Sequence, residues 1–315
     1  MGDYRSYLNQ QKNVKGIQKK RRHRYLGKIL VLALVVYLGV FSSFSSNTLE
    51  EVLEENVETI ETSGENLDIQ NRLFDLVNHL SENIYKEKEL PIYYVDTTKK
   101  QIALSFDAAW GAEDFEEIMK ILDKHEVKVT FFMTGEWVSK NPKCVKELVK
   151  KGHDLGNHGE HHYDMTTISK EEMKEEIKKV HDSVKEIAEY DMNLFRPPYG
   201  AYNDEVIKTV KEMKYYPIQW SVDSLDWKDY GTDSIINTVC NHEALDDGAI
   251  ILCHNGAKYT AKALDEMITN LKKQGYELVP ISKLIIKDNY HIDVTGKQIA
   301  DEKSNQKESI KSSEN

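Results

Sequence analysis

The sequence predicts an α/β barrel, because short apolar segments typical of buried strands alternate with longer segments of helical periodicity. Helical stretches between consecutive strands act as crossover connections, which make the strands that they join parallel. About seven such strand–helix units occur between residues 92 and 287, and this number favours a barrel over an open sheet. Hydrophobic residues make up 40% of the 315-residue chain, which is enough for a large core.

The expected elements follow one another in a regular order. Strands are expected at 102–106, at 127–133, at 154–157, from 195, at 217–222, at 249–253 and at 277–280. Helices are expected at 115–125, 137–151, 169–189, 204–213 and 259–273. The helix from 169 begins with a predicted capping box, in which Ser169 is followed three residues later by Glu172.

The first 90 residues differ in composition from this region. Residues 1–28 carry nine Lys or Arg against one Asp, and the apolar segment 29–46 follows. A bilayer-spanning helix needs ~20 mostly apolar residues, and a basic flank favours the cytoplasmic side. We therefore predict a basic cytoplasmic segment (1–28), a transmembrane anchor (29–46) and an acidic helical stem (47–90). The chain would then be a single-pass protein of the cell membrane with an external domain; a cleaved signal peptide is the alternative.

The remaining boundaries place a catalytic domain at 91–288 and a disordered, polar tail at 289–315. Without its basic start the chain is strongly acidic, which argues against nucleic acid as a partner. The three cysteines have no paired spacing, so the sequence indicates neither a disulfide framework nor a thiolate zinc site.

Five polar clusters follow predicted strands. They are Asp107, residues 157–162, residues 195–200, residues 223–227 and residues 252–256. Because the carboxyl ends of parallel strands lie at one end of a barrel, we expect all five clusters to meet at a single mouth.

Two of these clusters have metal or acid–base character. His158 and His162 are four residues apart, a spacing that places two imidazoles on one face of a helical turn and suits a zinc-like ion, although two surface histidines are the alternative. His161 would then point elsewhere. His254 ends a buried apolar strand and suits a general acid if a carboxylate such as Asp226 lies opposite, with Trp227 as an apolar wall.

A third cluster contains an arginine on a stiff segment, because Pro197 and Pro198 restrict the backbone directly after Arg196. A fixed guanidinium can hold a carboxylate in a bidentate grip. The alternative is a structural salt bridge beneath the site.

The region from about Tyr93 to Ile285 resembles the polysaccharide deacetylase family, the NodB-homology domain of carbohydrate esterase family 4. The matching motifs are Ser105-Phe106-Asp107, His158-xxx-His162 with Asp164-Met165, Arg196-Pro197-Pro198-Tyr199, Asp226-Trp227 and Leu252-Cys253-His254. Within the family, residues 102–111 and 91–97 are most similar to the PdaB-type branch of spore-forming bacteria, from which a role in sporulation would follow.

The resemblance implies a distorted (β/α)7 barrel that removes N-acetyl groups from amino sugars of cell-wall polysaccharide, most naturally peptidoglycan. A divalent metal, zinc or alternatively cobalt or manganese, would bind His158 and His162. Asp107 would be the general base, oriented by Arg196, and His254 would be the general acid, tuned by Asp226. The predicted substrate-binding side chains are Tyr199, Trp227, Leu252 and Trp110, of which Trp227 and Leu252 would line the acetyl pocket.

One position departs from the family pattern. The family has Phe-Asp-Asp-Gly, and its second Asp is the third metal ligand, whereas this chain has Ala108. Three interpretations follow: Asp107 moves onto the metal, Glu113 or Asp114 folds back to replace the ligand, or the metal site is weak and the cleft binds sugar without turnover. The main alternative to an N-deacetylase is therefore a non-catalytic glycan-binding or assembly protein. An amidase or O-deacetylase is a second alternative.

Overall fold

The computed structural model describes residues 89–301. The predicted basic segment 1–28, the predicted anchor 29–46, all of the predicted stem except its last two residues, and residues 302–315 lie outside the described residues. Within residues 89–301, no helix has both the length and the apolar character needed to cross a bilayer. The longest, α7 (Lys170–Ala188), buries only one side and is otherwise charged. This finding contradicts the predicted single-pass location in the cell membrane, which we withdraw.

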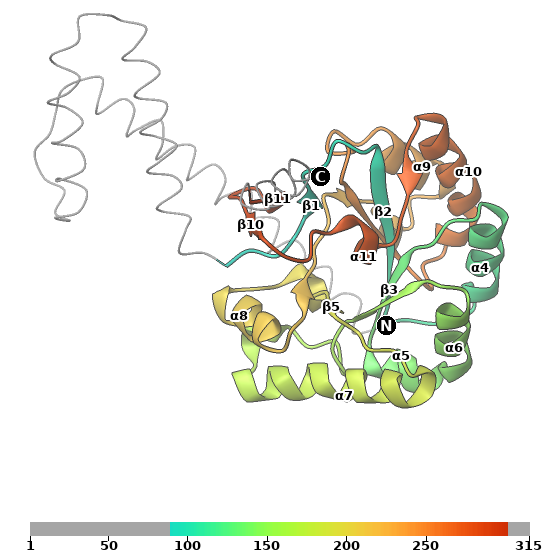
Figure 1. Ribbon diagram of the computed structural model, residues 1–315. Helices are drawn as coiled ribbons and strands as arrows, with labels where there is room; N and C mark the ends of the chain where they lie inside the picture. Colours follow the sequence, from blue (N-terminus) through green and yellow to red (C-terminus); the bar gives the residue numbers. More distant parts are fainter. Residues whose placement is uncertain (1–88, 302–315) are drawn as a thin grey trace, which may run out of the picture. The chain divides into compact units, whose positions relative to one another are not determined.

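The main sheet is parallel throughout and has the order β6-β5-β4-β3-β2-β8-β7, with β9 paired to β2. Figure 1 labels its strands β2, β3 and β5. Its strands are β2 (Gln101–Ala108), β3 (Thr130–Met133), β4 (Asp154–Asn157), β5 (Leu194–Phe195), β6 (Tyr216–Pro217), β7 (Val222–Asp223), β8 (Ile250–His254) and β9 (Glu277–Leu278). Strands β6 and β7 lie at opposite edges of the sheet but are joined directly by residues 218–221. The two edges therefore meet in one chain segment, which fits the predicted distorted (β/α)7 barrel.

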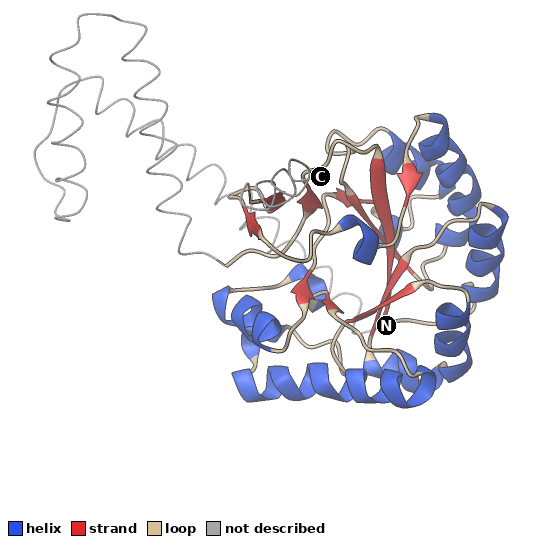
Figure 2. Cartoon of the chain, viewed as in Figure 1, coloured by secondary structure: helices blue, strands red, loops and turns tan. Residues whose placement is uncertain are grey.

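Helices surround this sheet on its outer side (Figure 2). Besides α7 they are α4 (Phe115–Lys124), α5 (Gly135–Lys140), α6 (Pro142–Lys150), α8 (Asp204–Glu212), α9 (Thr232–Cys240) and α10 (Thr260–Lys273). The short α11 (Ile281–Leu284) differs, because Ile281 and Leu284 pack with the apolar cluster inside the barrel. The capping box predicted for Ser169 and Glu172 is present at the start of α7. The single helix predicted at 137–151 is two helices, because Pro142 lacks an N–H and starts the second at its first turn.

Strand β2 divides the core into two parts because successive side chains point to opposite faces of a strand. Ile102, Leu104, Phe106 and Ala108 belong to the larger apolar cluster, which includes the helices. Ala103 belongs to the smaller cluster inside the barrel. Asp107 therefore shares the inner face with Ala103, whereas Ala108 points outward, toward the helices.

The predicted boundary at 288 and the predicted disorder from 289 are wrong for residues 290–300. These residues form β10 (Tyr290–Ile292) and β11 (Lys297–Ala300), and β11 pairs in parallel with β1 (Tyr94–Val95). The fully buried Gln298 accepts a hydrogen bond from Ile286 N at 2.9 Å and donates one to Ile286 O at 2.6 Å. Hydrogen bonds, rather than burial of apolar side chains, hold this segment in place, so its polar composition wrongly indicated disorder.

Candidate active site

Asp107 and His254 are neighbours at the carboxyl ends of two adjacent strands. They are register partners in the parallel pairing of β2 with β8. The backbone N–H of Asn255 donates to Asp107 O at 3.1 Å, which extends the pairing one residue further. Both side chains are nearly buried, with 6% and 7% of their surfaces exposed. The fold therefore places a carboxylate and an imidazole side by side at one mouth.

Arg196 holds Asp107 in place. Its Nη1 donates to Asp107 Oδ1 at 2.6 Å, and its Nη2 donates to Gln219 O at 3.1 Å. The guanidinium is fully buried and lies 4.1 Å from the ring centre of Phe132. Burial alone would raise the pKa of Asp107, but nearby positive charge, above all that of the Arg196 guanidinium, outweighs it and lowers this pKa. Asp107 is therefore an ionised, oriented carboxylate.

His158 and His162 converge, although the residues that join them form a bent loop with positive φ at Gly159 and His162 rather than the helical turn that their spacing predicted. Their Nε2 atoms lie 3.2 Å apart, and His158 Nε2 lies 3.5 Å from Asp107 Oδ2. The Nδ1 of His158 is 2.6 Å from Arg196 O, a carbonyl that can only accept, so Nδ1 carries the proton and Nε2 presents a lone pair. Burial is the main cause that lowers the pKa of both rings, to about 3 for His162. Both imidazoles are thus neutral.

His254 has a fully buried carboxylate partner. Asp226 Oδ1 lies 2.7 Å from His254 Nδ1, and Asp226 Oδ2 accepts from the backbone N–H of His254 and from the hydroxyl of Thr260, both at 2.7 Å. Burial lowers the pKa of His254, but the charge and hydrogen bond of Asp226 outweigh it, and the pKa is raised. The protonated imidazole is favoured, with Nε2 left to face the cleft.

The predicted substrate-binding side chains lie around these groups. The ring of Tyr199 contacts that of His162 edge-on, with 4.4 Å between centres. Leu252 is on the same face of β8 as His254 and pairs in register with Ser105. Trp227 is 5% exposed and follows Asp226 in a 3₁₀ turn (Asp226–Lys228). Trp110 stacks on His254, with 5.0 Å between ring centres and 16° between planes.

Neither acidic residue proposed to replace the missing ligand reaches the histidines. Both oxygens of Asp114 accept from Gly256 N at 3.0 Å, and Asn255 Nδ2 also donates to Asp114 Oδ1. The carboxylate of Glu113 packs over Gly111, so close that a Cβ there would lie 1.8 Å from it. Asp114 therefore ties the loop after β2 to the loop after β8.

Several supporting residues were missed by the sequence reasoning. Glu176, a buried carboxylate of α7, accepts from His161 N at 2.8 Å and lies 2.7 Å from His161 Nδ1. Asn157 Nδ2 donates to Ile177 O at 2.7 Å, and Asn157 Oδ1 accepts from Gly159 N at 3.0 Å. Helix α7 thus anchors the histidine loop, and the His161 side chain contacts Glu176 rather than joining His158 and His162. The only sequence signal for Glu176 was a carboxylate on the apolar side of α7.

The donor set fits part of a metal site. Two ligand atoms at ~2.0–2.1 Å from one tetrahedral zinc are roughly 3.4 Å apart, close to both the 3.2 Å and the 3.5 Å separations. Lone pairs and neutral rings at His158 and His162 are what such an ion requires. The third ligand expected from the family pattern is missing, because Ala108 occupies its position. Within residues 89–301, no group of three or more His, Cys, Asp or Glu has the arrangement of a metal site. The residues present therefore fit two histidine ligands, with Asp107 Oδ2 as the nearest third oxygen.

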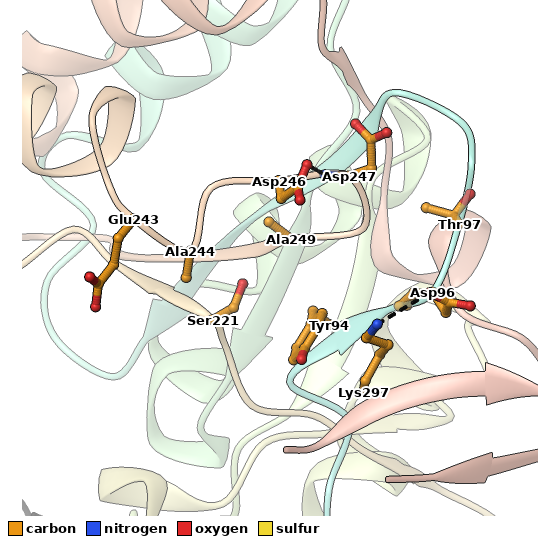
Figure 3. A pocket seen from close by; sticks show the side chains of 11 residues that line it. Tyr94, Asp96, Thr97, Ser221, Glu243, Ala244, Asp246, Asp247, Ala249 and Lys297 are labelled. Carbon is orange, nitrogen blue, oxygen red and sulfur yellow. Dashed lines mark hydrogen bonds and ion pairs between the residues drawn. The ribbon is translucent and has the colours of Figure 1, made fainter. Parts of the chain in front are cut away.

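A separate cavity of about 400 Å³ lies at the other end of the strands (Figure 3). Its lining includes Tyr94 of β1, Lys297 of β11, and Ser221 and Ala249, which directly precede β7 and β8. Because these are the amino ends of the strands, this cavity is distinct from the mouth that carries Asp107 and His254.

Comparison with known proteins agrees with this geometry. Residues 94–218 match the family model described as polysaccharide deacetylase. The peptidoglycan-N-acetylmuramic acid deacetylase PdaA of Bacillus subtilis is 35% identical over 207 residues, which are 63% of this chain and 76% of that protein. The solved structure of PdaA, a family 4 carbohydrate esterase, has a TM-score of 0.59, with 65% of this chain and 87% of that chain covered at 33% identity.

Two further relatives bear on activity. The peptidoglycan-N-acetylglucosamine deacetylase PgdA of Listeria monocytogenes is 40% identical over 187 residues, which are 59% of this chain but only 39% of that protein. A pseudoenzyme of carbohydrate esterase family 4 from Bacillus anthracis is 36% identical, with a TM-score of 0.60 and coverage of 62% of this chain and 69% of that chain. A mutant of that pseudoenzyme has restored enzymatic activity. With its motifs, barrel and relatives in agreement, this chain belongs to the polysaccharide deacetylase family, as a NodB-homology domain of carbohydrate esterase family 4.

Proposed function

We propose that this chain is a metal-dependent hydrolase that removes N-acetyl groups from amino sugars of peptidoglycan. The observation that carries the proposal is the pairing of Asp107 with His254 at adjacent strand ends, each held by its own buried partner, Arg196 or Asp226. The lowered pKa of Asp107 keeps its carboxylate ionised, and the raised pKa of His254 favours its protonated form. Amide hydrolysis needs such a base and acid on either side of one carbonyl.

Each residue has a separate task in this reaction. Asp107 accepts a proton from the attacking water, while Arg196 keeps the carboxylate aimed at it. The water oxygen adds to the acetamido carbon, and the C–N bond then breaks. His254 donates its proton to the departing nitrogen, which leaves as the free amine, and acetate is the other product. Trp227 and Leu252 form apolar walls for the acetyl methyl group, and Tyr199 and Trp110 contact the sugar.

His158 and His162 are the residues that would hold a divalent ion, with zinc the best match to two imidazoles and cobalt or manganese as alternatives. When bound, such an ion acts as a Lewis acid that lowers the pKa of water and polarises the carbonyl. Arg196 contributes here too, because its carbonyl fixes the tautomer of His158.

The cell wall is the proposed source of the substrate because the relatives named as enzymes act on peptidoglycan. One of these relatives is named as an N-acetylmuramic acid deacetylase and the other as an N-acetylglucosamine deacetylase, so the feature common to their substrates is an N-acetylated amino sugar.

The test is acetate release by the purified full chain from N-acetylated wall fragments, with metal content measured in the same preparation. We expect acetate and new free amines, both abolished in Asp107→Asn. Release of acetate with new hydroxyls instead of amines would indicate O-deacetylation. No acetate after addition of zinc, cobalt or manganese would contradict a hydrolase function.

A non-catalytic glycan-binding protein is the second candidate, and Ala108 is the observation that favours it. The similarity to a family pseudoenzyme supports the same candidate. If this candidate is right, the full chain should bind wall fragments equally well as wild type and as Asp107→Asn, and neither protein should release acetate.

A further inference from the structure

We propose that three exposed aromatic side chains, Trp110, Tyr163 and Tyr230, form a binding face for a glycan chain that spans several sugar rings. The inference rests on the proposed function, because it takes the substrate to be an N-acetylated glycan. It goes further in one respect: it assigns side chains outside the acid–base pair that recognise the length of the glycan.

The first argument is where exposed apolar surface occurs. Among the described residues, the large hydrophobic side chains that are exposed are Trp110 (37%), Tyr163 (50%), Tyr230 (68%) and Val294 (46%). All three aromatic ones lie in connections that leave the carboxyl ends of strands: Trp110 is two residues after β2, Tyr163 is six after β4, and Tyr230 is seven after β7, beyond the 3₁₀ turn Asp226–Lys228. Val294 lies between β10 and β11, outside the barrel. The exposed aromatic surface is therefore confined to the mouth that holds Asp107 and His254.

The second argument is the order of these strands. In the sheet, β4 and β2 are separated by β3 alone, and β2 and β7 by β8 alone. With neighbouring strands ~4.8 Å apart, each pair of aromatic loops starts ~10 Å apart along the curved edge. Trp110, beside His254, is thus central, and Tyr163 and Tyr230 flank it on either side. One sugar ring on Trp110 cannot reach both flanking positions, whereas a chain of linked rings can.

The third argument is that two of the aromatic rings are held by built contacts. Trp110 stacks on His254, and its loop is tied down by Asp114 and by a hydrogen bond from Trp137 Nε1 to Gly111 O at 3.2 Å. Tyr163 stacks on His161, with 5.2 Å between centres and 22° between planes. Glu176 fixes that histidine in turn. Rings restrained in this way lose little conformational freedom when a ligand covers them.

Tyr230 is placed by the turn that also carries Asp226 and Trp227. Lys228 Nζ lies 5.2 Å from the ring centre of the buried Trp227 and 5.6 Å from that of the exposed Tyr230, so one ammonium group contacts both rings. Pyranose rings present a face of C–H groups, and exposed aromatic rings at a binding surface gain affinity by covering such apolar area.

The experiment is calorimetric titration of the full chain with N-acetylglucosamine oligosaccharides from one to six sugars long. In the wild type we expect affinity to rise with length. In Tyr163→Ala and in Tyr230→Ala we expect affinity for the longest oligosaccharide to fall roughly three- to tenfold, with little change for the monosaccharide. Val294→Ala is the matched control, because it removes a comparably exposed apolar side chain away from the mouth, and it should bind every length like the wild type.

Tyr163 and Tyr230 are the diagnostic positions because, unlike Trp110, neither stacks on the acid–base pair. Thermal unfolding of each variant separates a folding defect from a binding defect, and Tyr163→Leu keeps apolar bulk if the alanine variant is destabilised. Equal affinity of variants and wild type at every length would overturn the inference, as would the absence of any length dependence.

This binding assay is independent of turnover. If long oligosaccharides bind through Tyr163 and Tyr230 but no acetate is released, the hydrolase function fails and the binding face stands. If acetate is released and the tyrosine variants act on long and short substrates like the wild type, the function stands and the binding face fails.

Discussion

The Nε2 atom of His162 lies 3.2 Å from the Nε2 atom of His158, and only His158 has its other ring nitrogen committed to a backbone carbonyl. This geometry makes His158 the ring whose lone pair is fixed by the fold. The separation suits two ligands of one tetrahedral ion.

The first prediction compares His158 with His161. His158→Ala should abolish both retained zinc and acetate release, because it removes the oriented lone pair. His161→Ala should be mild, because that side chain contacts Glu176 rather than the other two histidines. Zinc content by atomic absorption checks both variants. If they lost metal equally, the two-histidine assignment would be wrong.

The second prediction concerns Ala108, which is fully buried against apolar side chains. Ala108→Asp should lower the free energy of unfolding of the metal-free protein by several kcal/mol, because a lone buried carboxylate is costly. If the new carboxylate reaches the histidines, zinc should raise the melting temperature of this variant more than that of the wild type. Unchanged metal response, measured by differential scanning fluorimetry, would mean that position 108 faces only the helices.

The third prediction tests Asp226 through the pH dependence of activity. His254 acts while protonated, so activity should fall as pH rises through its raised pKa. Asp226→Asn removes the main charge that raises this pKa, and the alkaline limb of the pH profile should therefore shift to lower pH. Asp229→Asn is the control: its carboxylate is exposed and belongs to the same loop. A profile whose alkaline limb stays in place in Asp226→Asn would argue against His254 as the acid.

The fourth prediction concerns His153, far from the proposed chemistry. Burial lowers its pKa from 6.5 to about 4, and Val129 N donates to its Nδ1 at 3.2 Å. Between pH 6.5 and about 4, His153 therefore binds a proton in the unfolded chain but not in the folded chain. Stability should be fully present above pH 6.5 and should decline by roughly 3 kcal/mol as pH falls toward 4.

His153→Asn isolates this effect, because the amide oxygen can still accept from Val129 while the titration is removed. Urea unfolding at pH 7 and at pH 4.5 should show a smaller pH-dependent loss in this variant. The same loss in both proteins would place the sensitive group elsewhere.

The barrel was predictable because its strands are short and apolar and its helices are amphipathic, a contrast visible without coordinates. Helix α9 was not predicted, because its run of Thr, Ile and Val has low helix propensity and its stability comes from packing against α10 and β7. The segment predicted as one strand at 217–222 is extended but pairs with β5 in its first part and with β8 in its last. No local pattern can reveal that two edges of a sheet meet in one segment.

For the site, position at strand ends predicted which side chains meet, but not how they are held. Asp226 was expected beside His254, and the structure adds Thr260 as a second donor to the same carboxylate. Asp114 was considered as a metal ligand, yet it binds the backbone of Gly256 instead. These contacts join residues 34 and 142 positions apart, and their partners are common residues without a motif.

The parallel pairing of β1 with β11 also decides how the domain responds to force. Tyr94 lies opposite Lys297, so the strand that enters the domain runs beside the strand that leaves it, in the same direction. Tension between the two ends of the domain pulls these neighbours past each other lengthwise, and their hydrogen bonds must break together rather than one at a time. The entering chain is also bonded to the barrel just ahead of β1, through Ile92 N to Pro217 O (2.8 Å) and Gln219 N to Ile92 O (2.7 Å), so tension would reach the β1–β11 pair and the barrel together.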